Sequence, residues 1–442
     1  MRGGGDMPDI IEPRVLKGFR DYLPEAEIQR SALLAALESV FRSFGFVPID
    51  TPALEYAEIL LGKGGGETDK QVYRFRDHGD RDVALRFDLT VPFARFMAEH
   101  VDELYLPFRR YHMAKVWRGE NTQRGRYREF MQCDFDIVGT DSAAADADIV
   151  LVIDSALEAL DAGEFGIRIN HRGIFNRFLA RSGVTEKSSA VLRLVDKLEK
   201  IGTEELRRLL AEEAGESFAA EVLAFISAET SFDDPLAKME SLAGGPGPDT
   251  DRLRRIRDCV AEGGSVGRLR LDPSITRGLD YYTGVVFETT LDALPQIGSV
   301  CSGGRYDELA GLYTTRSLPG VGASVGLDRL IAALEALERG HREAGFSKLL
   351  VLNLEDSFLP RYEAIAAACR AAGIPCELYP EKRKLAAQFG YAERKGIPFA
   401  LLLGTAEAER GVVSLKNLST RESRDFSTPQ AAAAGLREWL KM

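Results

Sequence analysis

The sequence predicts an α+β fold for residues 15–345, interrupted by a helical insertion at about 185–262, and a small α/β domain for residues 346–442. Three observations lead to this prediction. Strand-like runs, two of which form a long antiparallel hairpin, dominate the first region. Apolar residues at helical spacing fill the insertion, and strands alternate with helices at the C-terminal end. A chain of 442 residues also exceeds one ordinary hydrophobic core, so more than one domain is expected.

Composition indicates a soluble globular protein. Hydrophobic residues make up 45% of the chain and charged residues 28%. Because there is no apolar run of membrane-spanning length and no secretion leader, we expect a cytoplasmic location and no membrane partner. The five cysteines are scattered without a C-x-x-C pair, which indicates a reducing compartment without disulfides. The five histidines show no H-x-x-x-H spacing, so a protein-only metal site is not expected. Residues 1–14 are predicted to be disordered, and Met1 and Met7 are both possible starts.

The charge of the chain is uneven. The net charge of −11 argues against a protein that coats nucleic acid without specificity. Between Arg109 and Arg128, however, seven Lys or Arg residues stand against one Glu. Because salt screens exposed charges beyond about 8 Å, such a basic segment can act independently of the overall charge. It therefore suggests an anionic partner at this segment.

The first elements are a helix and a strand that leads into a second helix. The spacing of Leu33, Leu37 and Phe41 predicts a helix that ends near Gly45. The extended, proline-containing segment "FVPIDTPALE" follows it. In "VALRFDLTVPFARFMAEH" we expect a strand and then a helix capped by Thr90.

The predicted hairpin carries the charged stretch "WRGENTQRGRYREF", residues 117–130. If strand alternation continues through it, Arg126, Arg128 and Phe130 share one face, as do Arg118 and Glu120. Guanidinium groups match phosphate oxygens, and a ring could stack on a base. An exposed hairpin with cross-strand salt bridges is the alternative at this point.

The same strand continues with side chains suited to an amino acid. Gln132, Asp134 and Asp136 alternate along it and therefore point to one side. Carboxylate and amide groups beside an arginine row suit a ligand that has both an ammonium group and a phosphate or carboxylate. An exposed strand face is the equally open alternative.

Glycine-rich segments mark the region after the insertion. "CSGGRYDEL" is predicted to be a turn feeding a helix, where backbone N–H groups could bind an anion. In "GVGASVGLDRL" we expect a strand with bare faces that leads into a helix carrying Arg329. From residue 346 the alternation predicts a largely parallel sheet. Its first strand is not followed by G-x-G-x-x-G, which disfavours dinucleotide binding.

These motifs, in this order, resemble those of the class II aminoacyl-tRNA synthetases and, within them, the histidyl-tRNA synthetase family. "GFVPIDTPALE" is similar to motif 1, "VWRGE…RGRYREF" to motif 2 and "GVGASVGLDR" to motif 3. "RGLDYYTGVVFE" and "SGGRYDEL" resemble the two signatures of histidyl enzymes, and "KGFRDYLP" and "RFDLTVPFAR" also match. The resemblance extends from about residue 15 to the end of the chain.

The resemblance implies a fold and an activity. It implies an antiparallel catalytic sheet with a helical insertion at about 185–262, a C-terminal α/β anticodon-binding domain at 346–442, and a homodimer. The implied reaction is ATP-dependent ligation of L-histidine to tRNA(His) through histidyl-adenylate, with release of AMP and pyrophosphate. ATP is then a substrate, and Mg²⁺ binds through its phosphates.

The resemblance also implies roles for individual residues. Arg118 and Arg277 are the catalytic residues and hold the ATP α-phosphate from opposite sides. ATP further contacts Glu120, Arg126, Phe130 and Arg329, with adenine between Phe130 and Arg329. The histidine pocket is formed by Asp88, Leu89, Thr90, Arg118, Gln132, Asp136, Arg277, Tyr281 and Tyr282. Arg124 and Arg128 are expected to contact tRNA, although Arg126 and Arg128 could each serve ATP or the acceptor stem.

Two other protein classes fit parts of this pattern. A synthetase-like regulatory subunit of histidine biosynthesis shares the catalytic fold, but such proteins usually lack the anticodon domain and depart from the catalytic signatures. A threonyl or prolyl synthetase shares motifs 1 to 3 but not "RGLDYY". The residues present therefore favour a histidyl enzyme.

Overall fold

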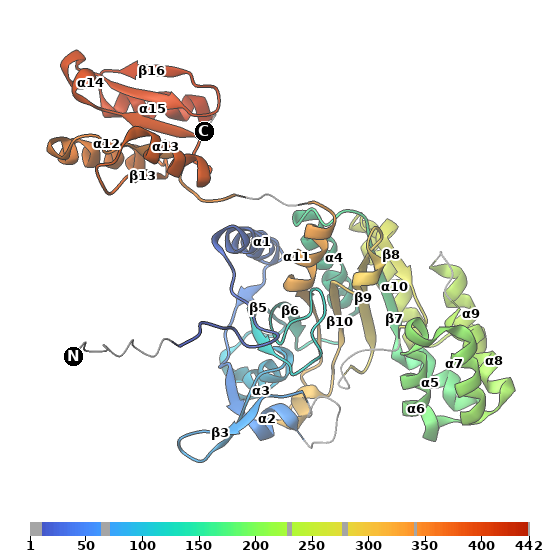
Figure 1. Cartoon of the computed structure of the whole chain (residues 1–442). Helices are drawn as coiled ribbons and strands as arrows, with labels where there is room; N and C mark the ends of the chain where they lie inside the picture. The colour runs from blue at the N-terminus through green and yellow to red at the C-terminus, as the bar shows by residue number, and fades with distance from the viewer. Residues whose placement is uncertain (1–10, 63–70, 228–231, 276–281, 340–342, 441–442) are drawn as a thin grey trace, which may run out of the picture. The chain divides into compact units, whose positions relative to one another are not determined.

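The computed structural model describes residues 11–62, 71–227, 232–275, 282–339 and 343–440. The chain divides into two compact units, a larger one that holds residues 11–21 and 33–339 and a smaller one that holds residues 22–32 and 343–440 (Figure 1).

An antiparallel sheet organises the larger unit. Among the described residues its strands follow the order β1-β5-β6-β11-β10-β9-β7-β8. Their bounds are β1 (Val47–Pro48), β5 (Phe108–Trp117), β6 (Glu129–Val138), β7 (Phe165–His171), β8 (Leu269–Leu271), β9 (Val285–Leu291), β10 (Cys301–Arg305) and β11 (Gly320–Gly326). The outer pairs β1–β5 and β7–β8 are parallel, and the other neighbours are antiparallel. The predicted antiparallel sheet and the β5–β6 hairpin are confirmed.

Helices cover one face of this sheet. The helices of the larger unit are the part of α1 (Pro24–Ser43) from Leu33 onward, α2 (Ala57–Leu61), α3 (Thr90–His100), α4 (Ala143–Ala159), α5 (Arg172–Arg181), α6 (Ser188–Val195), α7 (Leu198–Ala214), α8 (Glu216–Ile226), α9 (Asp233–Ala243), α10 (Pro248–Glu262) and α11 (Leu327–Ala336). On β6 the side chains alternate, so that Cys133, Phe135 and Ile137 pack into the core beneath the helices. The opposite face of β6 carries polar residues and forms the site described below.

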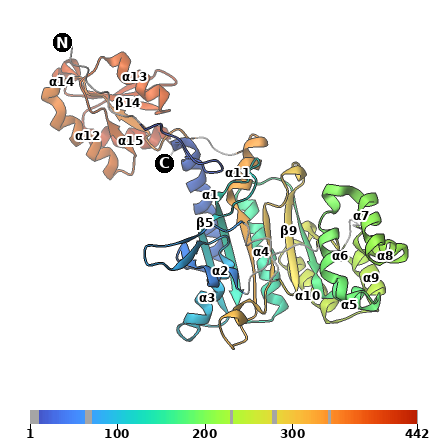
Figure 2. The ribbon, with the colours of Figure 1, turned by 60° about the horizontal axis from the view of Figure 1, so that its bottom comes forward.

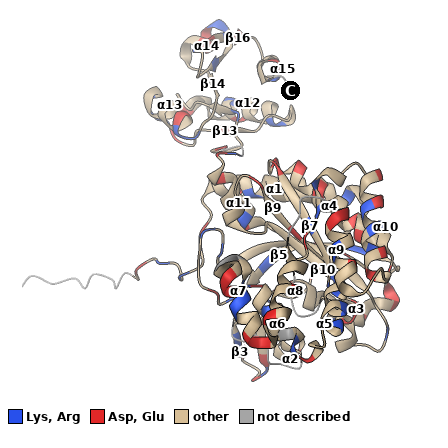
Figure 3. Cartoon of the chain, turned by 90° about the vertical axis from the view of Figure 1, so that its right-hand side faces the viewer, with Lys and Arg blue, Asp and Glu red and all other residues tan. Residues whose placement is uncertain are grey.

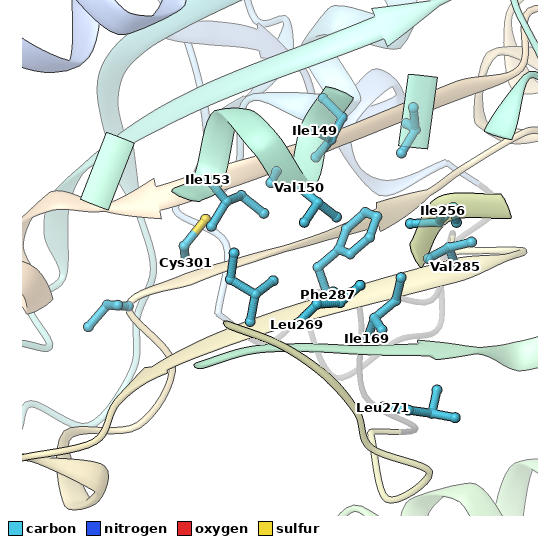
Figure 4. Packing of buried hydrophobic residues seen from close by; sticks show 14 of the residues in the cluster. Ile149, Val150, Ile153, Ile169, Ile256, Leu269, Leu271, Val285, Phe287 and Cys301 are labelled. Atoms are coloured by element: carbon cyan, nitrogen blue, oxygen red, sulfur yellow. The ribbon is translucent and has the colours of Figure 1, made fainter. Parts of the chain in front are cut away.

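The core of the larger unit lies between helices and strands. Figure 4 shows Ile149, Val150 and Ile153 of α4 above Phe287 of β9 and Leu269 of β8. All five side chains are at most 7% exposed. Burial of this kind stabilises the fold by about 25 cal/mol per Å² of apolar surface. The sheet is thereby fixed from the helical side, which leaves its other face available for a ligand.

The helical segment between β7 and β8 packs around phenylalanine rings. Phe178 of α5 stacks on Phe225 of α8 with ring centroids 4.8 Å apart, and Phe175 meets the same ring edge-on at 5.1 Å. Figures 1 and 2 show helices α5 to α9 gathered beside the β7 and β8 edge of the sheet. In Figure 3 the ribbon segments coloured for charged residues are prominent on helices such as α7 and α10, whereas most of the strands are tan.

A small sheet and helix α3 lie near the polar face. The small sheet has the order β2-β4-β3, with β2 (Leu54–Tyr56), β4 (Asp82–Leu85) and β3 (Arg74–Arg76). Thr90 is the first residue of α3, so its predicted role as the cap is wrong. The capping acceptor is Asp88, whose Oδ1 accepts a hydrogen bond from the N–H of Val91 at 3.2 Å.

The smaller unit has a mixed sheet in the order β13-β12-β14-β15-β16. Its strands are β12 (Leu349–Val351), β13 (Cys376–Leu378), β14 (Phe399–Leu402), β15 (Val413–Asn417) and β16 (Ser423–Phe426), and its helices are α12 (Leu359–Ala371), α13 (Leu385–Arg394), α14 (Thr405–Arg410) and α15 (Pro429–Leu440). β12, β13 and β14 are parallel, but β15 and β16 add antiparallel pairs. The expectation of a largely parallel sheet was therefore wrong. The edge strand β16 is mostly exposed and charged, so it lacks the apolar pattern that marks a strand.

We expect Phe135→Ala to destabilise the larger unit by about 3–5 kcal/mol, because it leaves a cavity beneath the sheet. Phe135 is fully buried and its ring lies 5.0 Å from that of Phe41. Urea unfolding followed by Trp117 fluorescence in a Trp439→Phe background measures this unit. Phe75→Ala, at a position of the larger unit that is 47% exposed, is the matched control and should change stability by less than about 0.5 kcal/mol. Equal effects of the two substitutions would contradict the packing described here.

Candidate active site

The hairpin strands end before the arginine cluster. β5 ends at Trp117 and β6 begins at Glu129, so Arg118 to Arg128 lie outside the strands and the alternation expected for them is wrong. The last cross-strand bond joins the N–H of Arg118 to the carbonyl of Arg128 at 2.9 Å. The N–H of Arg128 is not paired with β5; it donates to the carbonyl of Gly18 in the N-terminal segment at 2.8 Å. The cluster is thus a loop held by a third segment of the chain.

A pocket with aromatic and basic walls lies at the base of this loop. The aromatic pocket has a volume of about 140 Å³ and includes Arg118, Glu120, Arg126, Phe130 and Arg329 among its walls. The Arg118 guanidinium carbon lies 5.2 Å from the centroid of the Phe130 ring. Arg118 Nε donates to the carbonyl of Phe87 at 2.8 Å, and its Nη1 lies 3.7 Å from Glu120 Oε1. A flat ring with an anionic tail would find a stacking surface and guanidinium groups here.

Arg329 enters this pocket from the first turn of α11. Its Nη1 donates to the carbonyl of Ser299, which fixes the guanidinium at the pocket wall. Burial and the neighbouring Arg126 charge lower the pKa of Arg329 to about 10, so it stays cationic at neutral pH. The sequence-predicted ATP residues Arg118, Glu120, Arg126, Phe130 and Arg329 are therefore brought together in one pocket.

A second pocket with acidic walls adjoins the first. The acidic pocket has a volume of about 220 Å³ and includes Thr90, Asp134, Asp136 and Tyr282. It shares Arg118, Gln132, Ser302 and Ser324 with the aromatic pocket. Because these residues form a common wall, two ligands bound in the two pockets would meet beside Arg118.

Two predicted contacts do not line the acidic pocket, and two others lie outside the described residues. Asp88 is 1% exposed and Leu89 fully buried, and neither lines the pocket. Asp88 instead caps α3, and the contact of Leu89 with histidine stays a prediction. Arg277 and Tyr281 lie outside the described residues, so their placement stays a prediction.

Asp136 is held from three sides. The Tyr306 hydroxyl donates to its Oδ1 at 2.5 Å, and Arg110 Nη2 lies 2.8 Å from its Oδ2. Opposite it stands Gly322 of β11, where an added Cβ would lie 2.0 Å from Asp136 Oδ1. The expectation that this glycine strand leaves a bare face for a flat ligand is therefore wrong at Gly322, because the Asp136 carboxylate occupies that space.

The first part of "CSGGRYDEL", Cys301–Arg305, is strand β10, and the predicted turn is confined to the residues after it, before a short 3-10 helix (Leu309–Leu312). Its Gly303 and Gly304 lie between β9 and β11, where the neighbouring backbone approaches closely. Arg305 follows them and forms a buried ion pair with Asp146 at 2.7 Å. Tyr306 then enters the acidic pocket. The segment acts through its side chains and not through a helix N-terminus.

A third, basic cavity of about 780 Å³ adjoins the aromatic pocket. Arg124, Arg126, Arg168 and Arg329 are among its lining residues, with Glu288 as the carboxylate. Arg126 thus faces both cavities. Arg128 does not line either one, because its guanidinium donates to the carbonyls of Glu120 at 3.2 Å and Lys17 at 3.4 Å.

Sequence reasoning left two acidic-pocket residues, and Arg110 beside the pocket, out of the expected site. The alternation along β6 already placed Asp134 with Gln132 and Asp136, but the resemblance did not include it in the histidine pocket. Tyr306 lies inside the recognised "SGGRYDEL" segment. Arg110 had no such signal, since its burial depends on the cross-strand partner that the hairpin register supplies.

The N-terminal segment braces the aromatic pocket. Arg20 Nη2 donates to Asp328 Oδ1 at 2.7 Å, and its Nη1 donates to the Tyr127 hydroxyl at 3.0 Å. Asp328 Oδ2 in turn accepts the N–H of Met131 at 2.7 Å. Asp328 is 3% exposed and precedes Arg329 on α11. One carboxylate therefore joins the N-terminal segment, β6 and the helix that carries Arg329.

Two further properties concern metals and membranes. Across the residues that the structure describes, no group of three or more His, Cys, Asp and Glu side chains could hold a metal ion. In that same part of the chain no helix has the length and apolar character needed to cross a membrane.

Comparison with known proteins identifies the family. A family model described as histidyl-tRNA synthetase matches residues 18–330. The chain belongs to the histidyl-tRNA synthetase family. A second model, described as an anticodon binding domain, matches residues 348–438. These matches confirm the resemblance seen in the motifs. The C-terminal match also distinguishes the chain from regulatory paralogues without that domain.

Relatives match along nearly the whole chain. Histidine–tRNA ligases from Treponema denticola and Rhodopirellula baltica are 55% and 51% identical, covering 96% and 98% of this chain and 98% and 99% of theirs. The crystal structure of histidyl-tRNA synthetase from Nostoc superposes with a TM-score of 0.86 at 33% identity. It covers 97% of this chain and 100% of that chain. These likenesses confirm the predicted fold class of a catalytic domain and a separate anticodon-binding domain.

We expect Arg20→Met to weaken ATP binding about tenfold, the loss typical of one charge-assisted hydrogen bond. The substitution removes one of the hydrogen bonds that hold Asp328, and thereby loosens the start of α11 that positions Arg329. Isothermal titration with ATP measures the effect. Arg42→Met removes an arginine whose ion pair with Glu38 is exposed and should leave ATP affinity unchanged. The bracing role would be excluded if Arg20→Met bound ATP as tightly as this control.

Proposed function

We propose that this protein ligates L-histidine to tRNA(His) in two steps, through histidyl-adenylate, with release of AMP and pyrophosphate. The observation that carries the proposal is the common wall of the two pockets. The aromatic pocket suits ATP, the acidic pocket suits an amino acid, and Arg118 lines both. Membership of the histidyl-tRNA synthetase family supports the same reaction.

In the proposed first step the histidine carboxylate attacks the ATP α-phosphorus in line, and pyrophosphate leaves. Arg118 holds the α-phosphate from the wall that the pockets share, and Arg277 holds it from the other side. Adenine stacks against Phe130, with Arg329 across from it. Such a reaction depends on orienting the reactants and neutralising charge rather than on a protein nucleophile.

In the proposed acidic pocket the ligand is recognised through its two basic groups. Asp88, Thr90 and Gln132 surround the ammonium group, with Asp88 acting at longer range because it does not line the pocket. Asp136 and Tyr282, with Tyr281, bind the imidazole, whose nitrogens can donate and accept hydrogen bonds. The fixed position of the Asp136 carboxylate supports this assignment.

In the proposed second step a tRNA hydroxyl attacks the activated histidyl carbonyl and releases AMP. The basic cavity beside the aromatic pocket supports entry of the acceptor end there, with Arg124 and Arg126 as phosphate contacts. Arg128 fits this role less well because backbone carbonyls occupy its guanidinium. Residues 346–442 are proposed to bind the anticodon.

The proposed partners include a metal ion and a second copy of the chain. Mg²⁺ would arrive with ATP and neutralise phosphate charge, and Glu120 and Glu288 offer carboxylate oxygens at the cavity walls. A homodimer is supported by exposed apolar side chains near motif 1, where Val47 is 47% and Tyr56 51% exposed. Because the substrate is tRNA, we propose that the enzyme works in the cytoplasm.

The decisive experiment is ATP–pyrophosphate exchange with each of the standard amino acids. We expect exchange with histidine alone, since the acidic pocket is closed by residues that match both imidazole nitrogens. Threonine and proline serve as controls for the other class II synthetases considered above. A regulatory paralogue would show no exchange with any amino acid, and that result would end the proposal.

We expect Arg277→Ala to lower the rate of exchange by at least about 100-fold, because one of the two α-phosphate contacts is lost. Folding and oligomeric state should not change, as measured by thermal unfolding and light scattering. Arg270→Ala is a control in the same segment, since its exposed ion pair with Asp292 faces no part of the site. If Arg277→Ala exchanged ATP and pyrophosphate at the wild-type rate, Arg277 would have no role in the mechanism.

A further inference from the structure

We propose that Arg110 is a positioning residue for the histidine pocket, where it keeps Asp136 ionised and directed at the ligand from behind the pocket wall. The inference rests on the proposed function and adds a residue that does not itself touch a substrate. Arg110 is absent from the walls of both pockets. It acts through Asp136 alone or together with Asp134.

The register of the hairpin places the two charges against each other. Arg110 of β5 lies directly opposite Asp136 of β6, and Arg110 Nη2 is 2.8 Å from Asp136 Oδ2. Arg110 is fully buried, and Asp136 is 2% exposed. The guanidinium carbon lies 4.0 Å from the ring centroid of Phe93 on α3, which holds it from the far side.

The contact is electrostatic rather than a directed hydrogen bond. The three Arg110 nitrogens are buried and make no hydrogen bond to the residues that the structure describes, although Nη2 is within ion-pair distance of Asp136. Arg110 therefore stabilises the Asp136 carboxylate through its positive charge. The Tyr306 hydroxyl supplies the directed hydrogen bond to the other oxygen, Asp136 Oδ1. The two partners together leave little freedom for the carboxylate to turn.

The need for a cation comes from the number of carboxylates buried here. Asp88, Asp134 and Asp136 are each at most 2% exposed, and Arg110 is the buried cation in direct contact with one of them. Burying carboxylates without a compensating charge is costly, and such groups take up protons instead. The groups that face Asp134 and Asp136 from the surrounding elements are Arg86, Asp88, Arg110, His112, Tyr282, Cys301 and Tyr306.

One carboxylate of this cluster titrates close to neutral pH. Burial, with a smaller contribution from the Asp136 charge, raises the pKa of Asp134 to about 7 against the opposing Arg110 charge. Burial also raises the pKa of Asp136, and Arg110 again opposes the rise. Removing Arg110 therefore moves both pKa values upward. At neutral pH the pair would then bind a proton and lose the negative charge that attracts the ammonium or imidazole N–H of histidine.

The test compares four proteins by ATP–pyrophosphate exchange from about pH 6.5 to about pH 8.5, across the neutral range in which Asp134 titrates. These are the wild type, Arg110→Met, Arg110→Lys and the control Arg268→Met. Arg268 has the same types of neighbour away from the pockets, with Asp154 at 2.8 Å and the Phe165 ring centroid at 4.6 Å, although its side chain is 32% exposed. The readouts are KM for histidine, KM for ATP and kcat.

We expect Arg110→Met to raise KM for histidine at least about tenfold near pH 7, with KM for ATP changed less than about twofold, because only the acidic pocket loses charge. The defect should shrink as pH rises, since higher pH ionises the carboxylates again. Arg110→Lys should restore most of the loss because it keeps the charge. Histidine titrates equally in all assays, so differences between variants report the protein.

Several outcomes would overturn the inference. An unchanged KM for histidine in Arg110→Met, equal increases in both KM values, or a defect independent of pH would each do so. If Arg110→Met does not fold, Asp134→Asn decides, because removing this neighbouring charge should move the pH dependence of KM for histidine to lower pH. An unmoved profile in Asp134→Asn would overturn the inference. Absence of exchange in the wild type would instead refute the proposed function.

Discussion

Strand β6 must satisfy two opposite environments at once, and the rest of the larger unit is arranged around that constraint. Its odd-numbered residues Cys133, Phe135 and Ile137 pack beneath helices, whereas Gln132, Asp134 and Asp136 line the acidic pocket. A slip of one residue in the pairing with β5 or β11 would exchange these faces. The hairpin register with β5 and the glycines of β11 prevent such a slip, because Asp136 fits only opposite Gly322.

Charges buried beside the site complete this arrangement. Arg110 balances Asp136 from the neighbouring strand β5, while Arg305 binds Asp146 of α4 and thereby fixes the strand that delivers Tyr306. Asp146 is fully buried and also accepts from Arg252 Nε of α10 at 2.6 Å. Breaking one member of such a group leaves an uncompensated buried charge, which costs about 3–5 kcal/mol. The same ion pairs therefore support the fold and set the geometry of the pocket.

Sequence reasoning was most successful where a local pattern or motif carried the information. The alternation on β6, the glycine strand before Arg329 and the alternating elements after residue 346 all produced the expected elements. It failed where another segment decided the local structure. The N-terminal segment replaces a hairpin partner at Arg128, and "CSGGR" is a strand because it pairs with β9 on one side and with β11 on the other. A charged, mostly exposed edge strand such as β16 lacks the alternating apolar residues from which a strand is predicted.

By itself the sequence determined the family, the order of the domains and the chemical types available to the site, because motif residues and their spacing are local properties. Only the tertiary structure decided which of those residues meet. It places Arg118 on the wall between two pockets, commits Arg128 to backbone carbonyls and withdraws Leu89 into the core. It also sets Arg110 behind Asp136. Burial and pairing of charges depend on contacts between strands and helices far apart in the chain, and no local pattern encodes them.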